Sequence, residues 1–470
     1  MALTAPLPPL LQKPAFAFSG CVERCRAQSK SKRTCERDCG LIAAKTAAGH
    51  ASDLSFQKLA QLEAHAQLRR MEALGSRLGM PLSSFVPVCR SASLLNRSRH
   101  RVDSVLIGGQ PVGRDWRYYS VVECEGRRRR RRGFCMLAKR GVNMHQTLTF
   151  VSRDGLYFRK APNLDASSSP MAHNLAILGD QNEYVLIGGM QDWNMPALWD
   201  RWLTTSSQWH SSWMLPTPQE NPASGIHMWR GSGWPPAAGE RNWSLPKIVI
   251  HGSRPSNCID RRPSRTGNLG CEFDGRLSLV RLRRPGLPFR LYSRANLREH
   301  SPVGGRAVQT SISHDLHTWS SWQPVRLARL PADTVDIYFF LVQRNPVDPE
   351  GSLLALFPVS QPPNACIAVA FSAATDGVNF SQPVNLLNVK LGWRTADEHG
   401  RGPVEWRATA HPSAGVFLRA ESVYIYVHHA VVGTDMEDAA GNPTRLERYI
   451  MPRSELEALT PQFSVSQLTV

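Results

Sequence analysis

The chain has 470 residues, of which 42% are hydrophobic and 20% charged, a composition typical of a folded globular protein. This length accommodates two or three domains, or one large domain with an appendage. No stretch approaches the roughly 18 consecutive apolar residues of a membrane-spanning helix. Nucleotide-binding and zinc-protease motifs are absent as well, so we expect neither a metal nor another cofactor.

The positive charge of the chain lies mainly in its N-terminal part. Residues 1–132 hold 24 lysines and arginines against 10 acidic residues, and the net charge of the whole chain is +18. The remainder is therefore nearly neutral. A nucleic-acid-binding domain usually has a basic face of its own, which argues against nucleic acid as a partner of the main domain.

The N-terminal part is predicted to begin with a disordered segment, residues 1–20, rich in proline and alanine. Residues 21–79 are predicted to form a helical hairpin and an amphipathic helix. In the hairpin, Cys21 and Cys25 lie on one helical face, as do Cys35 and Cys39, so two disulfides could join the helices antiparallel. This spacing resembles the twin Cys-x3-Cys hairpins of plant peptides and intermembrane-space chaperones. Zinc binding and unpaired cysteines are the alternatives.

Residues 80–135 are predicted to be a basic linker, and they contain the run Arg127 to Arg132. Six adjacent like charges repel one another and cannot be buried, so this run is expected to be a solvated loop. A processing site, a nuclear address and a patch for anionic surfaces are the functional alternatives to a loop without a role.

Residues 136–470 are rich in short strands and turns, and helical periodicity is nearly absent. This pattern predicts an all-β sandwich, barrel or propeller. The expected strands include Gln146–Val151, Asn174–Leu178, Tyr184–Ile187, Lys247–Ile250, Leu277–Leu282, Phe289–Tyr292, Ala307–Ile312, Ile337–Val342, Leu353–Phe357, Ile367–Ser372 and Val423–Val427.

A weak internal repeat favours the propeller. A serine or alanine, an aspartate two residues later and an aromatic residue four further on recur around Asp154, Asp315 and Asp376, each time after an apolar strand. The aspartate is expected to cap a hairpin turn, and Gly155 and Gly377 are expected to supply a positive φ. The last two copies are 61 residues apart, so about five blades of about 65 residues fit residues 136–470.

These turns resemble those of the five-bladed β-propeller glycoside hydrolases of the arabinanase and invertase group. Sialidases are the alternative, but their aspartate motif has one more residue before the aromatic. The fold class is therefore expected to be all-β, a five-bladed β-propeller with a small α-helical, cysteine-containing N-terminal appendage.

The resemblance implies that acidic residues project from inner strands toward the propeller axis and cleave a glycosidic bond as nucleophile or base and as general acid. Glu272 and Asp274 lie on one face of a strand and are the first candidates for this catalytic role. Asp165 and Asp336 are the candidate partner acids. The proline that follows such a pair in the family is missing here.

Polar residues near the expected inner strands are candidates for binding the substrate. They are His173, Asn174, Arg261, Arg262, Arg294, Arg401 and His411. A disulfide between Cys258 and Cys271 would clamp the basic loop that lies between them, closing about 14 residues and adding roughly 3 kcal/mol of stability.

The sequence therefore predicts a carbohydrate-binding propeller, acting as a glycoside hydrolase if the carboxylates converge at the axis. The alternative is a non-catalytic, lectin-like or protein-interaction scaffold. The expected partner is a carbohydrate or a small anionic ligand. Three N-x-S sequons, at Asn96, Asn242 and Asn379, are compatible with an extracellular or secretory location.

Overall fold

The computed structural model divides the chain into two units, residues 1–66 and 67–470, and all residues that it describes belong to the second. The described residues are 88–111, 116–125, 132–140, 146–161, 174–180, 183–190, 225–232, 247–251, 259, 273, 276–286, 288–296, 306–330, 336–395, 404–430 and 444–461. The predicted disordered segment, cysteine hairpin and amphipathic helix lie outside them. Among the described residues, no helix is long and apolar enough to cross a membrane.

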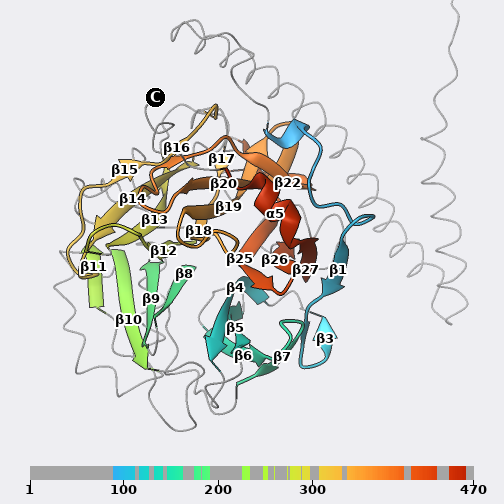
Figure 1. The fold of residues 1–470 in the computed structure, drawn as a ribbon, viewed down its shortest axis with the longest axis horizontal. Helices are drawn as coiled ribbons and strands as arrows, with labels where there is room; N and C mark the ends of the chain where they lie inside the picture. Colours follow the sequence, from blue (N-terminus) through green and yellow to red (C-terminus); the bar gives the residue numbers. More distant parts are fainter. Residues whose placement is uncertain are drawn as a thin grey trace, which may run out of the picture. The chain divides into compact units, whose positions relative to one another are not determined.

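The second unit is a five-bladed β-propeller, as predicted, and Figure 1 shows the blades arranged around a common centre. Strands β4, β8, β12, β18 and β25 lie nearest that centre, so they are the inner strands. The first three blades are β4 (Trp116–Glu125), β5 (Arg132–Arg140), β6 (Gln146–Ser152) and β7 (Tyr157–Lys160); β8 (Asn174–Asp180), β9 (Glu183–Met190), β10 (Gly225–Ser232) and β11 (Lys247–His251); and β12 (Ser278–Arg281), β13 (Phe289–Asn296), β14 (Arg306–Ser313) and β15 (Gln323–Pro324).

The last two blades differ from the simple four-stranded pattern. In blade 4, the long strand β19 pairs with two short strands in turn, and blade 5 takes its outer strand from the N-terminal part of the chain. Blade 4 is β17 (Asp336–Ile337), β18 (Leu341–Arg344), β19 (Ser352–Gln361), β20 (Asn364–Ala373) and β22 (Val384–Val389); blade 5 is β25 (Ala410–Arg419), β26 (Ser422–His429), β27 (Arg445–Pro452) and β1 (Arg101–Ser104). The remaining elements are η3 (Val88–Arg90), β2 (Leu106–Ile107), β3 (Gln110–Pro111), β16 (Arg326–Leu327), β21 (Asn379–Phe380), β23 (Leu391–Thr395), β24 (Val404–Ala408) and α5 (Arg453–Leu459).

The ring is closed by β1, which pairs antiparallel with β27. An ion pair of 2.7 Å between Asp103 and Arg448 joins the two strands, and Arg97 pairs with Glu447. Strands β1 to β4 thus lie within residues 80–135, where the sequence predicted a linker, and the propeller begins earlier than residue 136. The basic composition hid these strands, because β1 is short and half of its residues are charged.

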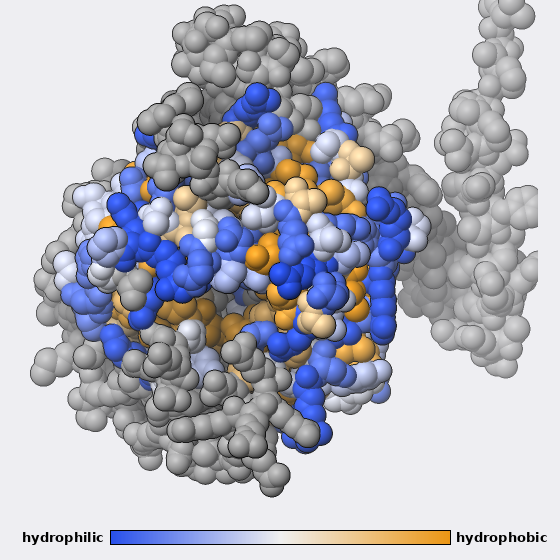
Figure 2. All heavy atoms as spheres, in the orientation of Figure 1, coloured by the Kyte–Doolittle hydropathy of each residue, from blue (hydrophilic) through white to orange (hydrophobic). Residues whose placement is uncertain are grey.

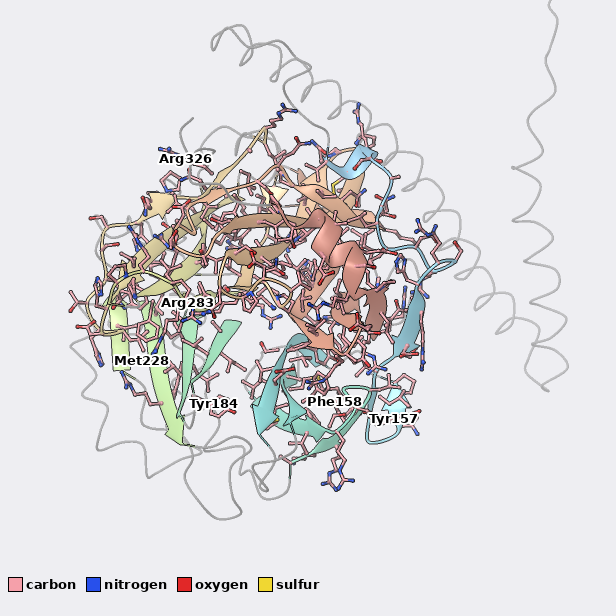
Figure 3. The ribbon with its side chains drawn as sticks, in the orientation of Figure 1. Tyr157, Phe158, Tyr184, Met228, Arg283 and Arg326 are labelled. Atoms are coloured by element: carbon pink, nitrogen blue, oxygen red, sulfur yellow. A yellow bond between two sulfur atoms is a disulfide. The ribbon has the colours of Figure 1, made fainter. Side chains whose placement is uncertain are left out.

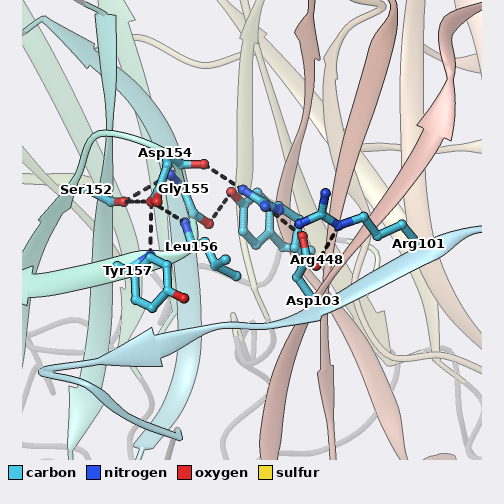
Figure 4. Close-up of polar contacts among 9 residues, drawn as sticks. Arg101, Asp103, Ser152, Asp154, Gly155, Leu156, Tyr157 and Arg448 are labelled. Carbon is cyan, nitrogen blue, oxygen red and sulfur yellow. Dashed lines mark hydrogen bonds and ion pairs between the residues drawn. The ribbon is translucent and has the colours of Figure 1, made fainter.

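The aspartate turns form as their residues predict, and Figure 4 shows the first of them. The carboxylate of Asp154 accepts hydrogen bonds from the hydroxyl of Ser152 at 2.9 Å and from the amides of Leu156 and Tyr157 at 2.9 and 3.0 Å. Gly155 takes the predicted positive φ of 69°. These bonds satisfy the backbone of a tight turn between the third and fourth strands of the blade.

Tyrosines connect two of these turns to the preceding blade. The hydroxyl of Tyr426 on β26 donates to the carbonyl of Gly155 at 2.7 Å, and Tyr292 on β13 donates to the carbonyl of Gly377 at 2.8 Å. Both tyrosines are buried and lie on the second strand of their blade. The repeated turn therefore also joins blade 5 to blade 1 and blade 3 to blade 4.

Replacement of Gly377 by alanine is expected to lower the free energy of unfolding by about 3 kcal/mol, from positive-φ strain and overpacking together. The residue has a φ of 70°, and an added Cβ would lie 2.5 Å from the hydroxyl of Tyr292. Gly108→Ala is the control, because Gly108 also has a positive φ but open space around its Cβ position. Urea unfolding should give a loss of only about 1 kcal/mol for the control. Equal losses in the two variants would contradict the role of the tyrosine contact.

Two disulfides hold the described strands together. Cys89 on η3 is bonded to Cys366 on β20, and Cys124 on β4 is bonded to Cys135 on β5. The first fixes the segment before the closing strand onto blade 4. The cysteine pairs that the sequence suggested, including Cys258 with Cys271, lie outside the described residues.

Apolar side chains fill the space between neighbouring blades. One cluster joins Leu282 and Val308 of blade 3 to Phe340 and Phe357, which lie in blade 4. Burial of such side chains contributes roughly 25 cal/mol per Å² of apolar surface, so the junctions between blades stabilise the fold. They also fix the inner strands around the axis.

Candidate functional site in the central channel

The inner strands of all five blades line a central channel of about 950 Å³. We call the end at which the inner strands begin the entry end, and the end at which they finish the exit end. The walls between the two ends are apolar, and they include Val121, Ile177, Leu279, Val342 and Val416, one residue from each inner strand. Gln343 lies among them and its side chain bonds to the backbone of Val416, whereas the charged residues of the lining lie at the two ends.

Arg276 lies at the entry end, two residues before β12, and is one of the residues that line the channel. Only 4% of the residue is exposed. Its guanidinium donates to the hydroxyl of Ser120 at 2.6 Å and to the carbonyl of Pro412 at 3.5 Å. Neither partner carries a charge, so a positive charge is buried here without a carboxylate among the described residues.

Burial lowers the pKa of Arg276 to about 9. The cause is desolvation, which disfavours the charged form when no anion compensates it. The guanidinium is nevertheless protonated at neutral pH, because this pKa lies above 7. The entry end of the channel thus holds a fixed positive charge.

A second group of charged residues surrounds Tyr338, in the segment between β17 and β18. Three guanidinium carbons lie near its ring centre: that of Arg306 at 4.9 Å and those of Arg294 and Arg407 at 5.5 Å each. The ring of His411, the second residue of β25, stacks on Tyr338 at 5.2 Å. We call these five residues the arginine cluster. Arginines within about 6 Å of an aromatic face are stabilised by its quadrupole.

Asp336 is fully engaged by an arginine of this cluster. The Nε and Nη2 atoms of Arg306 donate to the two carboxylate oxygens at 2.7 and 2.6 Å, and the backbone amide of Arg306 donates at 3.2 Å. The two side chains are almost fully buried. This bidentate geometry neutralises Arg306 and leaves neither oxygen of Asp336 without a donor.

His411 is neutral in the folded protein. Burial and the nearby charges of Arg407, Arg306 and Arg276 lower its pKa to about 3, although a hydrogen bond with the carbonyl of Ala408 opposes the shift. The unfolded histidine takes up a proton near pH 6.5 and the folded one near pH 3. Stability is therefore lost as the pH falls through this interval, because the unfolded state binds the proton more strongly.

The structure brings together three of the residues predicted for the site, namely Asp336, Arg294 and His411. Asp336 binds an arginine of the cluster, and the other two residues belong to it. Asn174 begins β8, an inner strand, but its side chain is not among those described. The other predicted site residues, Asp165, His173, Arg261, Arg262, Glu272, Asp274 and Arg401, lie outside the described residues.

The sequence interpretation missed four residues of this region: Arg276, Arg306, Tyr338 and Arg407. The three arginines could have been found from the sequence. Each of them lies next to or within an apolar stretch, where a residue is expected to be buried. A charge at such a position indicates either a buried ion pair or a ligand site.

No protein-family model matches the sequence. The sequence matches no curated protein either.

Solved structures similar to this one include enzymes that act on sugars. One is an N-acetylgalactosamine deacetylase from F. plautii in complex with blood group B trisaccharide, at a TM-score of 0.44 and 11% identity over 76% of this chain and 94% of that chain. Another comes from the GH130 family of mannoside phosphorylases, which contains glycoside hydrolases that target β-1,2 mannosidic linkages in Candida mannan. Its TM-score is 0.39 and its sequence identity is 11%, over 75% of this chain and 91% of that chain. A third is the GH93 α-L-arabinofuranosidase of Fusarium graminearum with arabinobiose. Its TM-score is 0.39 and its sequence identity is 9%, over 76% of this chain and 99% of that chain. At these identities the likeness concerns the fold alone.

Proposed function

We propose that the propeller binds an acidic carbohydrate at the entry end of its central channel. The observation that supports this function is the buried guanidinium of Arg276, a residue that lines the channel and whose hydrogen-bond partners among the described residues are neutral. Burial of an uncompensated charge is costly, and a ligand anion would supply the missing partner. A carboxylate or sulfate group of a sugar can accept two parallel bonds from a guanidinium.

The walls of the channel suit the remainder of such a ligand. A volume of about 950 Å³ lies within the usual range for small-molecule sites, which are mostly apolar with a few oriented polar groups. The C–H faces of a sugar ring pack on apolar side chains such as Leu279 and Val342. We therefore expect a ligand of one to three sugar rings.

In this proposal Asp336 positions Arg306 and does not take part in acid–base chemistry, since both of its oxygens already accept hydrogen bonds. Hydrolysis needs a pair of carboxyl groups on either side of the scissile bond. That activity remains a prediction which depends on Glu272, Asp274 and Asp165. The non-catalytic, lectin-like alternative requires none of them.

Calorimetric titration of the full chain with matched oligosaccharides tests the proposal. The ligands are di- and trisaccharides of galacturonate and glucuronate, their neutral methyl esters, and sulfated counterparts. At least one acidic ligand is expected to bind about tenfold or more tightly than its methyl ester, because charged hydrogen bonds contribute roughly 1.5–3 kcal/mol. Binding that is equal for acids and esters, or absent throughout the series, would contradict the proposal.

A further inference from the structure

The exit end of the channel is lined by four arginines that the entry-end proposal does not use. They are Arg281 of β12, Arg283 just after it, Arg344 of β18 and Arg419 of β25. Figure 3 labels Arg283 to the left of the middle of the view, and Figure 2 shows hydrophilic side chains over this part of the face. These arginines come from the inner regions of three different blades and meet at one opening.

Two glutamates pair with these arginines. The carboxylate of Glu350 bonds to Arg283 and lies 3.9 Å from Nη1 of Arg344, and that of Glu123 lies 2.8 Å from Nη1 of Arg419. Glu350 is the more exposed of the two, with 68% of its side chain accessible. One carboxylate is therefore shared between two guanidinium groups, and it can swing away into solvent.

Arg344 lies among other positive charges. Burial lowers the pKa of Arg344, the positive charges of Arg283 and Arg281 lower it further, and Glu350 opposes them. Like charges that lie this close repel each other, and a bound anion would relieve that repulsion.

The guanidinium groups are also held in position. Nη2 of Arg344 donates to the carbonyl of Arg281 at 3.1 Å, and the guanidinium of Arg281 lies over the ring of Phe289 at 4.7 Å. Arg419 lies over the ring of Phe134 at 4.5 Å. Donors that are fixed before binding lose less conformational entropy when they bind an anion.

We propose that the exit end is a second binding site, for an anion of the phosphate or sulfate class, and that Glu350 is an internal ligand which this anion displaces. A doubly charged tetrahedral anion offers more acceptor oxygens and more charge than one carboxylate does, so it bridges Arg283 and Arg344 more favourably. This site goes beyond the proposed carbohydrate function and does not depend on it.

Calorimetric titration with phosphate at low ionic strength distinguishes the roles of these residues. Arg344→Gln is expected to weaken phosphate binding about tenfold, by removal of a charged hydrogen bond. Glu350→Gln is expected to strengthen it about threefold, because it removes the competing carboxylate of an exposed ion pair. The control is Glu457→Gln, which removes an equal charge from the exposed Arg453–Glu457 pair of α5.

The direction of the Glu350 effect decides the proposal. If Glu350→Gln and Glu457→Gln bind phosphate with equal affinity, the change comes from net charge alone, and the proposal that phosphate displaces Glu350 is wrong. Weaker phosphate binding in Glu350→Gln than in the wild type would contradict the proposal as well. Parallel titrations with sulfate and glucose 6-phosphate distinguish a site for the free ion from one for an ester. The Arg276→Met variant should bind phosphate here like the wild type, so that failure of the entry-end site does not affect this test.

Discussion

Arg276→Met is expected to weaken binding of the acidic carbohydrate by about 100-fold, through the loss of two charged hydrogen bonds to the ligand. The same variant should unfold with a free energy equal to or higher than that of the wild type. The reason is that replacement of a buried, uncompensated ion by an apolar side chain of similar size is usually neutral or stabilising. Binding is thus predicted to weaken without a loss of stability, which a residue of purely structural importance would not produce.

Arg326→Met is the matched control for this variant. Arg326 lies on β16, its residue is exposed, and Figure 3 labels it at the edge of the propeller. Its replacement should leave both carbohydrate binding and unfolding unchanged. A loss of more than about 2 kcal/mol in Arg276→Met, measured by urea unfolding, would show that Arg276 stabilises the fold and would contradict the binding role.

Asp336→Asn is expected to lower the free energy of unfolding by about 3–5 kcal/mol, because it leaves the buried guanidinium of Arg306 without its anion. The geometry is bidentate and both side chains are nearly inaccessible to solvent. The double variant Asp336→Leu with Arg306→Met should recover most of this loss, since it removes both charges together.

These two variants also separate a structural carboxylate from a catalytic one. If Asp336→Asn unfolds like the wild type and the double variant is no better than the single one, the ion pair contributes little and Asp336 is available for another role. Unfolding should be followed at pH 7, well above the range in which His411 titrates.

The fold could be predicted from the sequence because its signals are local. The turns at Asp315 and Asp376 depend on residues within a few positions of each aspartate, and the 61 residues between them give the approximate length of a blade. The closing strand β1 could not be predicted in the same way, because its partner β27 lies more than 300 residues further along the chain.

The candidate site could be predicted only in part, for the same physical reason. Asp336 and His411 were recognised because they begin apolar strands, but the three arginines of the arginine cluster come from β13, β14 and β24. Arg276 is notable only once Ser120 and Pro412 are known to surround it. A sequence pattern shows which residue is charged, whereas only the packing of the blades shows that the charge is buried, with no carboxylate bound to it in the part of the chain that the structure describes.

A crystal structure of the full chain with the tightest-binding acidic oligosaccharide tests the central claim most directly. The account predicts that a carboxylate or sulfate oxygen of the ligand lies within about 3 Å of the guanidinium of Arg276, a normal hydrogen-bond distance. A ligand seated outside the channel would contradict the account. So would a carboxylate of the chain itself bound to Arg276 beside the ligand, because the guanidinium would then need no anion from the sugar.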